Sequence, residues 1–158
     1  MKKFILAAMA LVAMTFTSCE KAEIEMMETV EMAGDWVTTF SDGAGYEYEI
    51  PHGLTFNTAA NVPDEIWVSD AGWFWDFQAK VKCNLNTLTF ESDGWVENIS
   101  YDDCQVRITN GKIVKNGMTL PSGRVVDTIS YDIEFSDDDP GNVWHATGRR
   151  YTGFAEDE

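Results

Sequence analysis

Alternation of apolar and polar side chains at every second residue most constrains the fold of this 158-residue chain. Two stretches show it most clearly, residues 124–135 and residues 73–83. Side chains two residues apart project from the same side of a strand, so each stretch has one apolar face and one polar face. The pattern is typical of antiparallel strands that surround an interior and leave their other side in water.

Shorter strand candidates follow from residues rich in Val, Ile, Thr and aromatic side chains. They are residues 36–40, 46–50, 54–57, 65–69, 88–91, 104–109, 112–115 and 143–152. Turn residues separate them, among them Asp70-Ala71-Gly72, Asn110-Gly111 and Asn116-Gly117. Asn110-Gly111 is the strongest hairpin signal because a type I′ turn needs positive φ at both central positions. Strands of eleven or twelve residues favour a tilted, closed barrel of about eight strands over an open sandwich.

The N-terminus has the pattern of a secretory signal peptide. Two lysines, Lys2 and Lys3, precede an apolar run over residues 4–16 and a short segment of small residues that ends at Cys19. Residues 16–19 resemble a bacterial lipobox, in which Cys19 would become the first residue and carry acyl chains such as palmitate. The alternative, an uncleaved membrane anchor, is disfavoured because the run is shorter than the ~20 residues that span a bilayer.

These features divide the chain into four parts. We expect a lipoprotein signal peptide at 1–18, an acidic tether at 19–33, a barrel domain at 34–155 and a tail at 156–158. The lipobox places the protein in the outer membrane of a Gram-negative envelope. An acidic stretch after the acylated cysteine also resembles a signal for export to the cell surface, although a solvated spacer explains it equally well.

The charge of the chain excludes one class of partner. It has 11 Lys and Arg against 27 Asp and Glu, a formal net charge of −16. Such a surface repels phosphate backbones, so nucleic acid is not an expected partner. Contact with the membrane is expected through the lipid anchor, and the oligomeric state is left open.

Cysteine spacing points to no metal or cofactor. Cys83 and Cys104 remain after signal removal and match no C-x-x-C or zinc pattern, so the prediction is no cofactor and no metal. A disulfide is permitted in an oxidising compartment, and two free thiols are the alternative. Residues 137–142 are rich in carboxylates, which fits a solvated hairpin loop better than a calcium site.

Gly34-Asp35-Trp36 near the start and Arg149-Arg150 near the end resemble the calycin pattern of lipocalins. The resemblance implies that Gly34, Trp36, Arg149 and Arg150 close one end of the barrel, with a guanidinium over the Trp36 indole. Two features of true lipocalins, a second sequence motif and a C-terminal helix, are not found in this sequence.

Further segments resemble the family of lipid-binding putative hydrolases, small lipoproteins with a calycin-like barrel. The resemblance runs from Gly34 to Phe154, and the segments that carry it are 56–61, 64–67, 74–77, 108–112, 121–123, 134–138 and 148–154. The family implies a fold and a ligand class more than a reaction.

Large side chains on the predicted inner face form the candidate ligand site. It comprises Trp67, Trp75, Phe77, Tyr131 and Phe135, together with Asp127, which breaks the apolar face of its strand. Two alternatives stay open. The aromatic residues can be ordinary core, because eight strands can be filled by their own side chains. The carboxylate of Asp127 can lie at the rim and reach water.

Three functions therefore compete. The favoured one is non-catalytic binding of a small hydrophobic or amphipathic ligand. The second is a structural or interaction lipoprotein with a filled barrel, such as an accessory of an envelope or surface glycan system. A hydrolase comes third, because His52 and His145 are the only candidate bases and no G-x-S-x-G segment is present, so no catalytic residue is assigned.

Replacing Cys19 with Ala tests the anchor. Loss of the acylated sulfur should move the protein from the membrane fraction to the soluble fraction, whereas Cys83→Ala should leave it membrane-bound. Fractionation followed by immunoblotting measures the distribution. Sedimentation of the Cys19→Ala variant with membranes would contradict the lipobox assignment.

Overall fold

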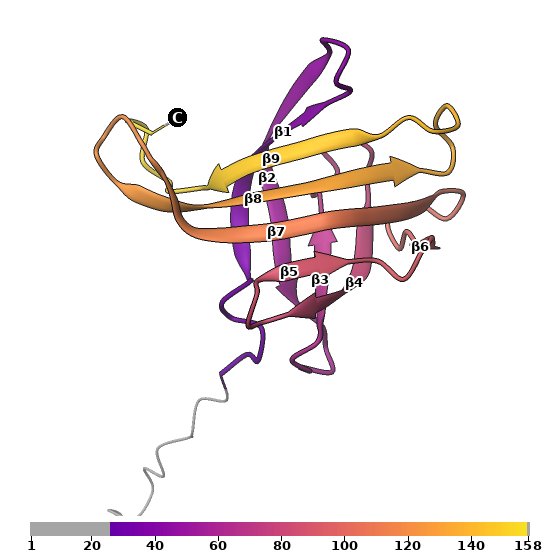
Figure 1. Cartoon of the computed structure of the whole chain (residues 1–158), viewed down its shortest axis with the longest axis horizontal. Helices are drawn as coiled ribbons and strands as arrows, with labels where there is room; N and C mark the ends of the chain where they lie inside the picture. The colour runs from indigo at the N-terminus through magenta and orange to yellow at the C-terminus, as the bar shows by residue number, and fades with distance from the viewer. Residues whose placement is uncertain (1–25, 158) are drawn as a thin grey trace, which may run out of the picture.

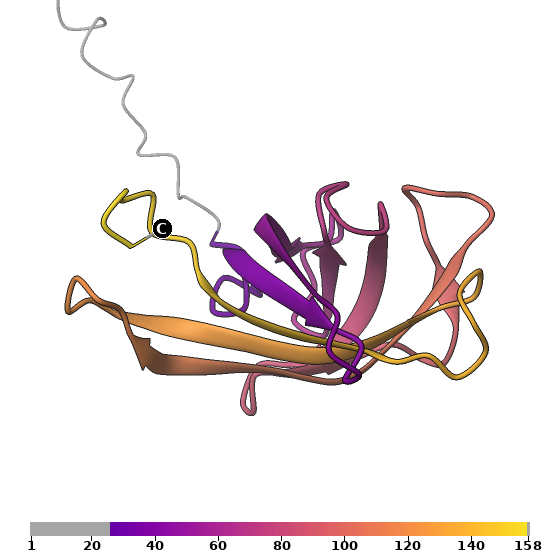
Figure 2. The same cartoon turned by 90° about the horizontal axis from the view of Figure 1, so that it is seen from above.

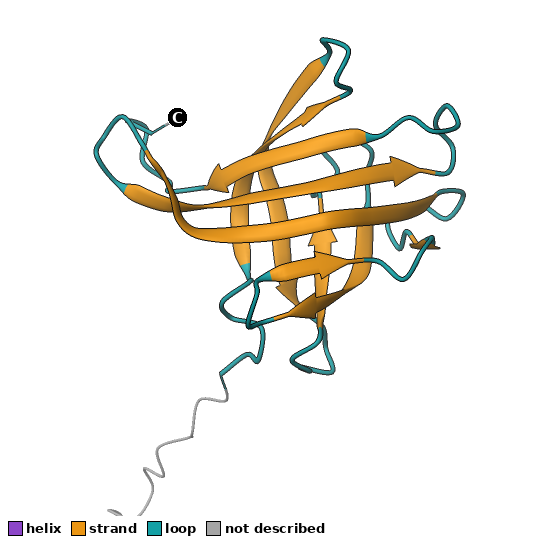
Figure 3. Ribbon diagram, viewed as in Figure 1, coloured by secondary structure: helices purple, strands orange, loops and turns teal. Residues whose placement is uncertain are grey.

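The computed structural model describes residues 26–157, and strands are its only regular elements there (Figures 1 and 3). In chain order they are β1 (Gly34–Ser41), β2 (Glu47–Asn57), β3 (Glu65–Ser69), β4 (Gln78–Asn84), β5 (Thr89–Glu91), β6 (Val96–Glu97), β7 (Gln105–Thr119), β8 (Val125–Phe135) and β9 (Trp144–Arg150).

Eight of these strands form a closed antiparallel barrel. The sheet order is β5-β4-β3-β2-β1-β9-β8-β7, and pairing of β5 with β7 closes it, while β6 pairs with the edge of β7. Figure 2 shows the magenta strands on one side of the interior and the orange strands on the other. The expected all-β, lipocalin-like barrel of about eight strands is confirmed.

Two predicted turns are wrong, because the chain passes through them without reversing. Asn110-Gly111 and Asn116-Gly117 both lie inside β7, where the pairing with β8 shifts register. Asn110 and Asn116 have φ of 55° and 53°, the conformation that a tight turn would also need. An extra residue with positive φ can make a β-bulge as well as a hairpin, so the same sequence signal has two structural outcomes.

The predicted strand at residues 73–83 is wrong in its first half. β4 begins at Gln78, and residues 70–77 form the loop that joins it to β3. Ala79 and Val81 face the interior as expected, but Trp73 is exposed. The alternation of apolar and polar side chains continues through the loop by coincidence. The backbone there is not that of a strand, since φ is positive at Ala71, Gly72 and Asp76.

The barrel has two different ends. At one end, which we call the mouth, lie the loops at residues 42–46, 70–77 and 136–143 and the segment 92–104, which contains β6. At the other, the closed end, lie the loops at residues 58–64, 85–88 and 120–124, together with both ends of the described chain (Figure 1). Ligand access is therefore to be sought at the mouth.

A stack around Trp36 seals the closed end. The indole is 1% exposed, and its Nε1 donates to Thr55 Oγ1 at 2.9 Å. The Arg150 guanidinium lies over the ring, with Cζ 4.5 Å from the ring centroid. An added Cβ at Gly34 would lie 2.6 Å from Arg150 Nη1 and 2.8 Å from the Trp36 ring, so this packing needs a glycine. Arg149, in contrast, points to the outer wall.

Residues assigned to the acidic tether contribute to the same seal. Met32 is fully buried, and its carbonyl accepts a hydrogen bond from Thr55 Oγ1 at 2.6 Å. Arg150 Nη1 donates to the carbonyl of Ala33 at 3.0 Å, and Lys115 pairs with Glu31. The polypeptide just before β1 is thus part of the folded unit.

The mutation Trp36→Ala should lower the free energy of unfolding by ~3–5 kcal/mol, the usual cost of truncating a buried aromatic residue. Trp73→Ala is the matched control, because Trp73 is 49% exposed. We expect it to cost less than ~1 kcal/mol. Urea unfolding measures both, and similar losses would show that the stack does not stabilise the barrel.

Candidate functional site

An aromatic cleft lies at the mouth of the barrel. Its volume is about 400 Å³. Its walls are Tyr46, Tyr48, Trp73, Phe74, Trp75 and Trp144. The residues come from the β1–β2 hairpin, the β3–β4 loop and the start of β9, and we call this site the mouth cleft. Volumes of this size are usual for sites that hold a small apolar ligand.

A single carboxylate shapes the β3–β4 loop. Asp70 is fully buried and accepts hydrogen bonds from five backbone N–H groups. Its Oδ1 accepts from Gly72 and Phe77, and its Oδ2 accepts from Phe74, Trp75 and Asp76, at 2.7–3.0 Å. The buried charge is balanced by these oriented N–H dipoles, which fold residues 70–77 into one rigid turn. We call this segment the plug loop.

The plug loop places three aromatic side chains in the mouth. Phe74 stacks on Phe40 with ring centroids 4.3 Å apart, and Trp75 stacks on Phe135 at 4.6 Å. Phe77 is fully buried and lies 5.7 Å from Phe135. The loop thereby covers the barrel interior, so the mouth cleft lies above the plug and not inside the barrel.

Side chains occupy the interior below the plug. The central residues are Ile66, Val68, Ala79, Val81, Val106, Ile108 and Ile133, each at most 2% exposed and part of one continuous core. Close packing of this kind is typical of protein interiors. The ordinary-core alternative for the inner aromatic face therefore describes the observed packing.

Carboxylates anchor the two tryptophans of the rim. Trp75 Nε1 donates to Asp137 at 3.0 Å, and Trp144 Nε1 donates to Asp138 at 2.8 Å. Burial acts to raise the pKa of Asp138, but the hydrogen bonds from Trp144, Asp139 and Asn142 lower that pKa overall. Both carboxylates thus hold indole rings in place and give the rim a negative potential.

The structure brings four of the six predicted ligand residues together. Trp75 and Phe77 each contact Phe135 at the mouth, and Tyr131 belongs to the same core, where it lies beside Phe40 at 6.2 Å between ring centroids. Burial, and then the charge of Asp70, raise the pKa of Tyr131 well above its usual range. Tyr131 is thus a neutral core phenol at neutral pH.

The other two predicted ligand residues lie elsewhere. Trp67 faces outward on β3, between the buried residues Ile66 and Val68. Asp127 lies at the closed end, where it accepts hydrogen bonds from Lys115, Asn116 and Arg150.

Donors around Asp127 outweigh the effect of its burial. Burial alone would raise the Asp127 pKa, but the hydrogen bonds from Asn116 and Lys115 and the charge of Arg150 lower it. Because the Asp127 pKa is lower in the folded state, the ionised carboxylate stabilises the folded protein at pH values above its ordinary pKa. This stabilisation is lost as the pH falls through the lowered pKa.

Sequence reasoning missed Asp70, Phe74, Tyr46 and Tyr48. The sequence of residues 70–72 predicts only a turn, and the alternation places Phe74 on the polar face. A signal was available, because an aspartate before a short Gly-containing loop often accepts hydrogen bonds from the loop backbone. Nothing in the sequence says that one aspartate accepts five.

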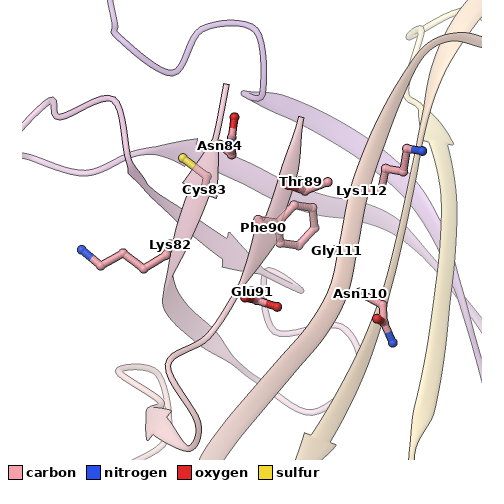
Figure 4. Close-up of a pocket in the computed structure, with 9 residues that line it drawn as sticks. All are labelled: Lys82, Cys83, Asn84, Thr89, Phe90, Glu91, Asn110, Gly111 and Lys112. Atoms are coloured by element: carbon pink, nitrogen blue, oxygen red, sulfur yellow. The ribbon is translucent and has the colours of Figure 1, made fainter. Parts of the chain in front are cut away.

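A second cleft lies on the outside of the wall where β5 joins β4 and β7 (Figure 4). It has a volume of about 490 Å³, and Lys82 and Lys112 lie on opposite sides of β5. Burial raises the pKa of the adjacent Cys83 thiol to about 11. Cys83 and Cys104 are both free thiols, so the open choice between disulfide and thiols is resolved in favour of thiols.

Each histidine is paired with one aspartate. His52 Nδ1 lies 3.0 Å from Asp35, and His145 Nδ1 lies 2.7 Å from Asp132. In the part of the chain that the structure describes, no hydrogen bond joins either ring to a Ser, Thr or Cys side chain. Within residues 26–157, no three His, Cys, Asp or Glu side chains are grouped so that they could hold a metal ion together.

Comparison with known proteins identifies the family. A family model described as lipid-binding putative hydrolase matches residues 21–155, and the chain belongs to this family. No curated protein matches the sequence. Within residues 26–157, no helix is long and apolar enough to cross a membrane. Membership of a lipid-binding family fits a β-barrel with an apolar cleft at its mouth.

The mutation Asp70→Asn tests the plug loop. The amide group would turn donors toward backbone N–H groups, leaving buried donors without acceptors, and should cost ~2–5 kcal/mol of unfolding free energy. Asp76→Asn is the control, because Asp76 is exposed in the same loop. It should change the stability by less than ~0.5 kcal/mol. Urea unfolding measures both variants, and equal stabilities would contradict the role of Asp70.

Proposed function

We propose that this protein is a non-catalytic, lipid-anchored envelope protein that binds a small hydrophobic or amphipathic ligand in the mouth cleft. The observation that carries the proposal is the gathering of six aromatic side chains around an open volume of about 400 Å³. Apolar side chains that remain partly open to water at a concave site gain free energy when a ligand covers them. The lipid-binding family supports the same ligand class.

The chemistry of the rim narrows the ligand. Asp137 and Asp138 lie beside the two rim tryptophans, and the hydroxyls of Tyr46 and Tyr48 come from the opposite hairpin. An acyl chain or a flat apolar ring suits the aromatic walls, whereas an anionic group is repelled by the nearby carboxylates. A neutral or cationic polar group on an apolar body is the best match.

The anchor and the location belong to the same proposal. Cys19 lies outside the described residues, so its acylation and the outer-membrane location rest on the lipobox resemblance. The described chain begins at the closed end of the barrel, opposite the mouth. A protein tethered from that end can present its mouth to the surrounding aqueous phase.

The second candidate is a structural or interaction lipoprotein, and the filled interior favours it. Trp36, Phe40 and Phe77 are each at most 1% exposed. A barrel that needs its core for stability can serve as a rigid scaffold without a ligand. The third candidate, a hydrolase, is supported by the two His–Asp pairs, but it needs a nucleophile beside one of them.

Titration with a fluorescent analogue of a neutral monoacylglycerol, followed by quenching of tryptophan emission, tests the ligand site. The wild-type protein should show saturable binding, and Phe74→Ala should weaken it at least ~10-fold, as expected for an aromatic contact at the centre of a site. Trp67→Ala is the matched control, because Trp67 lies on the outer wall, and its binding should be unchanged.

Two results would contradict this proposal. Absence of saturable binding to the wild-type protein would favour the scaffold. Loss of binding in Trp67→Ala with retention in Phe74→Ala would move the site to the outer wall.

A further inference from the structure

We propose that a third cleft, on the outer wall around Arg149, binds the oxyanion group of a small amphiphile. The cleft has a volume of about 410 Å³ and lies over β1, β7, β8 and β9, with Glu49 of β2 at one edge. It is separate from the mouth cleft, and the inference does not depend on the proposed function.

The first observation is the state of the Arg149 side chain. Its Nη1 is buried and has no hydrogen-bond partner within residues 26–157. Arg107, Arg124 and Arg150 each form an ion pair with a carboxylate. In a chain with 27 Asp and Glu, one arginine of the described part therefore stands without a counter-ion. A buried N–H without an acceptor is costly, so an acceptor supplied by a ligand would be favourable.

The second observation is the arrangement of hydroxyl groups around Arg149. Across the sheet, Arg149 pairs with Thr128 on β8. One row further along, Thr147 pairs with Thr39 on β1 and Ser130 on β8. All four hydroxyl-bearing residues line the cleft with Arg149. A guanidinium beside hydroxyl donors is a suitable set for a carboxylate or phosphate, which accepts hydrogen bonds from both.

The third observation is the apolar floor of the cleft. Val37 is 6% exposed although it lies on the outer face of β1, and Met118 lines the same cleft. An inorganic anion would leave this surface uncovered, whereas the apolar part of an amphiphile would cover it.

The charge of Glu49 sets the polarity of the site. Glu49 pairs with Thr39, which places it two strands away from Arg149. Repulsion from this carboxylate directs the oxyanion to the Arg149 end of the cleft and excludes it from the other.

Isothermal titration of the full chain in a neutral detergent tests the inference, with octyl phosphate and inorganic phosphate as probes. Octyl phosphate should bind saturably, and R149Q should weaken its binding at least ~10-fold, the effect of losing hydrogen bonds to a charged group. K80Q is the matched control. It removes the same charge from Lys80 on β4, which β3, β2 and β1 separate from β9, and binding should be unchanged.

The two probes separate the sources of the oxyanion. Tighter binding of octyl phosphate than of inorganic phosphate supports the amphiphile, and equal affinities would overturn that part of the proposal in favour of a free anion. Equal weakening in R149Q and K80Q, or no saturable binding of either probe, would overturn the site itself.

A second pair of variants keeps the test valid if R149Q does not fold. R149K retains the charge but loses the planar fork, so it should weaken octyl phosphate binding several-fold. Phe74→Ala at the mouth should leave this binding unchanged. If Phe74→Ala abolished it, the probe would be bound at the mouth and the Arg149 site would be refuted.

Discussion

The hydrogen bonds of the Asp70 carboxylate decide whether the barrel is open or covered. Five backbone N–H groups of one short loop point at the same side chain, and this turns residues 70–77 back over the interior. Without that acceptor, the loop N–H groups would need water, and Phe74, Trp75 and Phe77 would lose the geometry that stacks them on the core. One buried charge thus links the backbone of a loop to the packing of the mouth.

The closed end of the barrel is covered by a different set of interactions. There the covering group is the Trp36 indole, held between Thr55 and the Arg150 guanidinium. Arg150 in turn bonds Asp127 and the carbonyl of Ala33, so strand β8 and the segment before β1 are tied to the same ring. Because both ends are covered, the core between them is closed to solvent, and the aromatic surface of the mouth cleft lies above the plug.

The sequence predicts the strands well, because period two is a direct consequence of strand geometry. The architecture and the covering of Trp36 by an arginine follow from that pattern and from the calycin resemblance. The sequence predicts the connections between the strands poorly. Asn110-Gly111 specifies positive φ and nothing more, and only the pairing of β7 with both β5 and β8 converts the signal into a bulge. The candidate site depended on a strand at residues 73–77, and the alternation there continues through a loop that a long-range carboxylate organises. Local periodicity cannot report such a contact, so it predicts the wrong face for Phe74 and nearly the correct one for Trp75 and Phe77.

A filled barrel and a lipid-binding family are compatible if the ligand does not have to enter the core. The mouth cleft offers aromatic surface already exposed to solvent, so a ligand can cover Tyr46, Tyr48 and Phe74 without breaking any hydrogen bond of Asp70. Entry into the interior would require the plug loop to move as a unit, because its N–H groups share one acceptor and none can be released without weakening the others' geometry. It would also displace rings that stack on Phe40 and Phe135. The free energy gained from a longer acyl chain would have to exceed both losses, whereas a short or compact ligand gains most of its contacts at the surface. The packing of the plug therefore favours ligands that are bound at the rim and remain partly in contact with water.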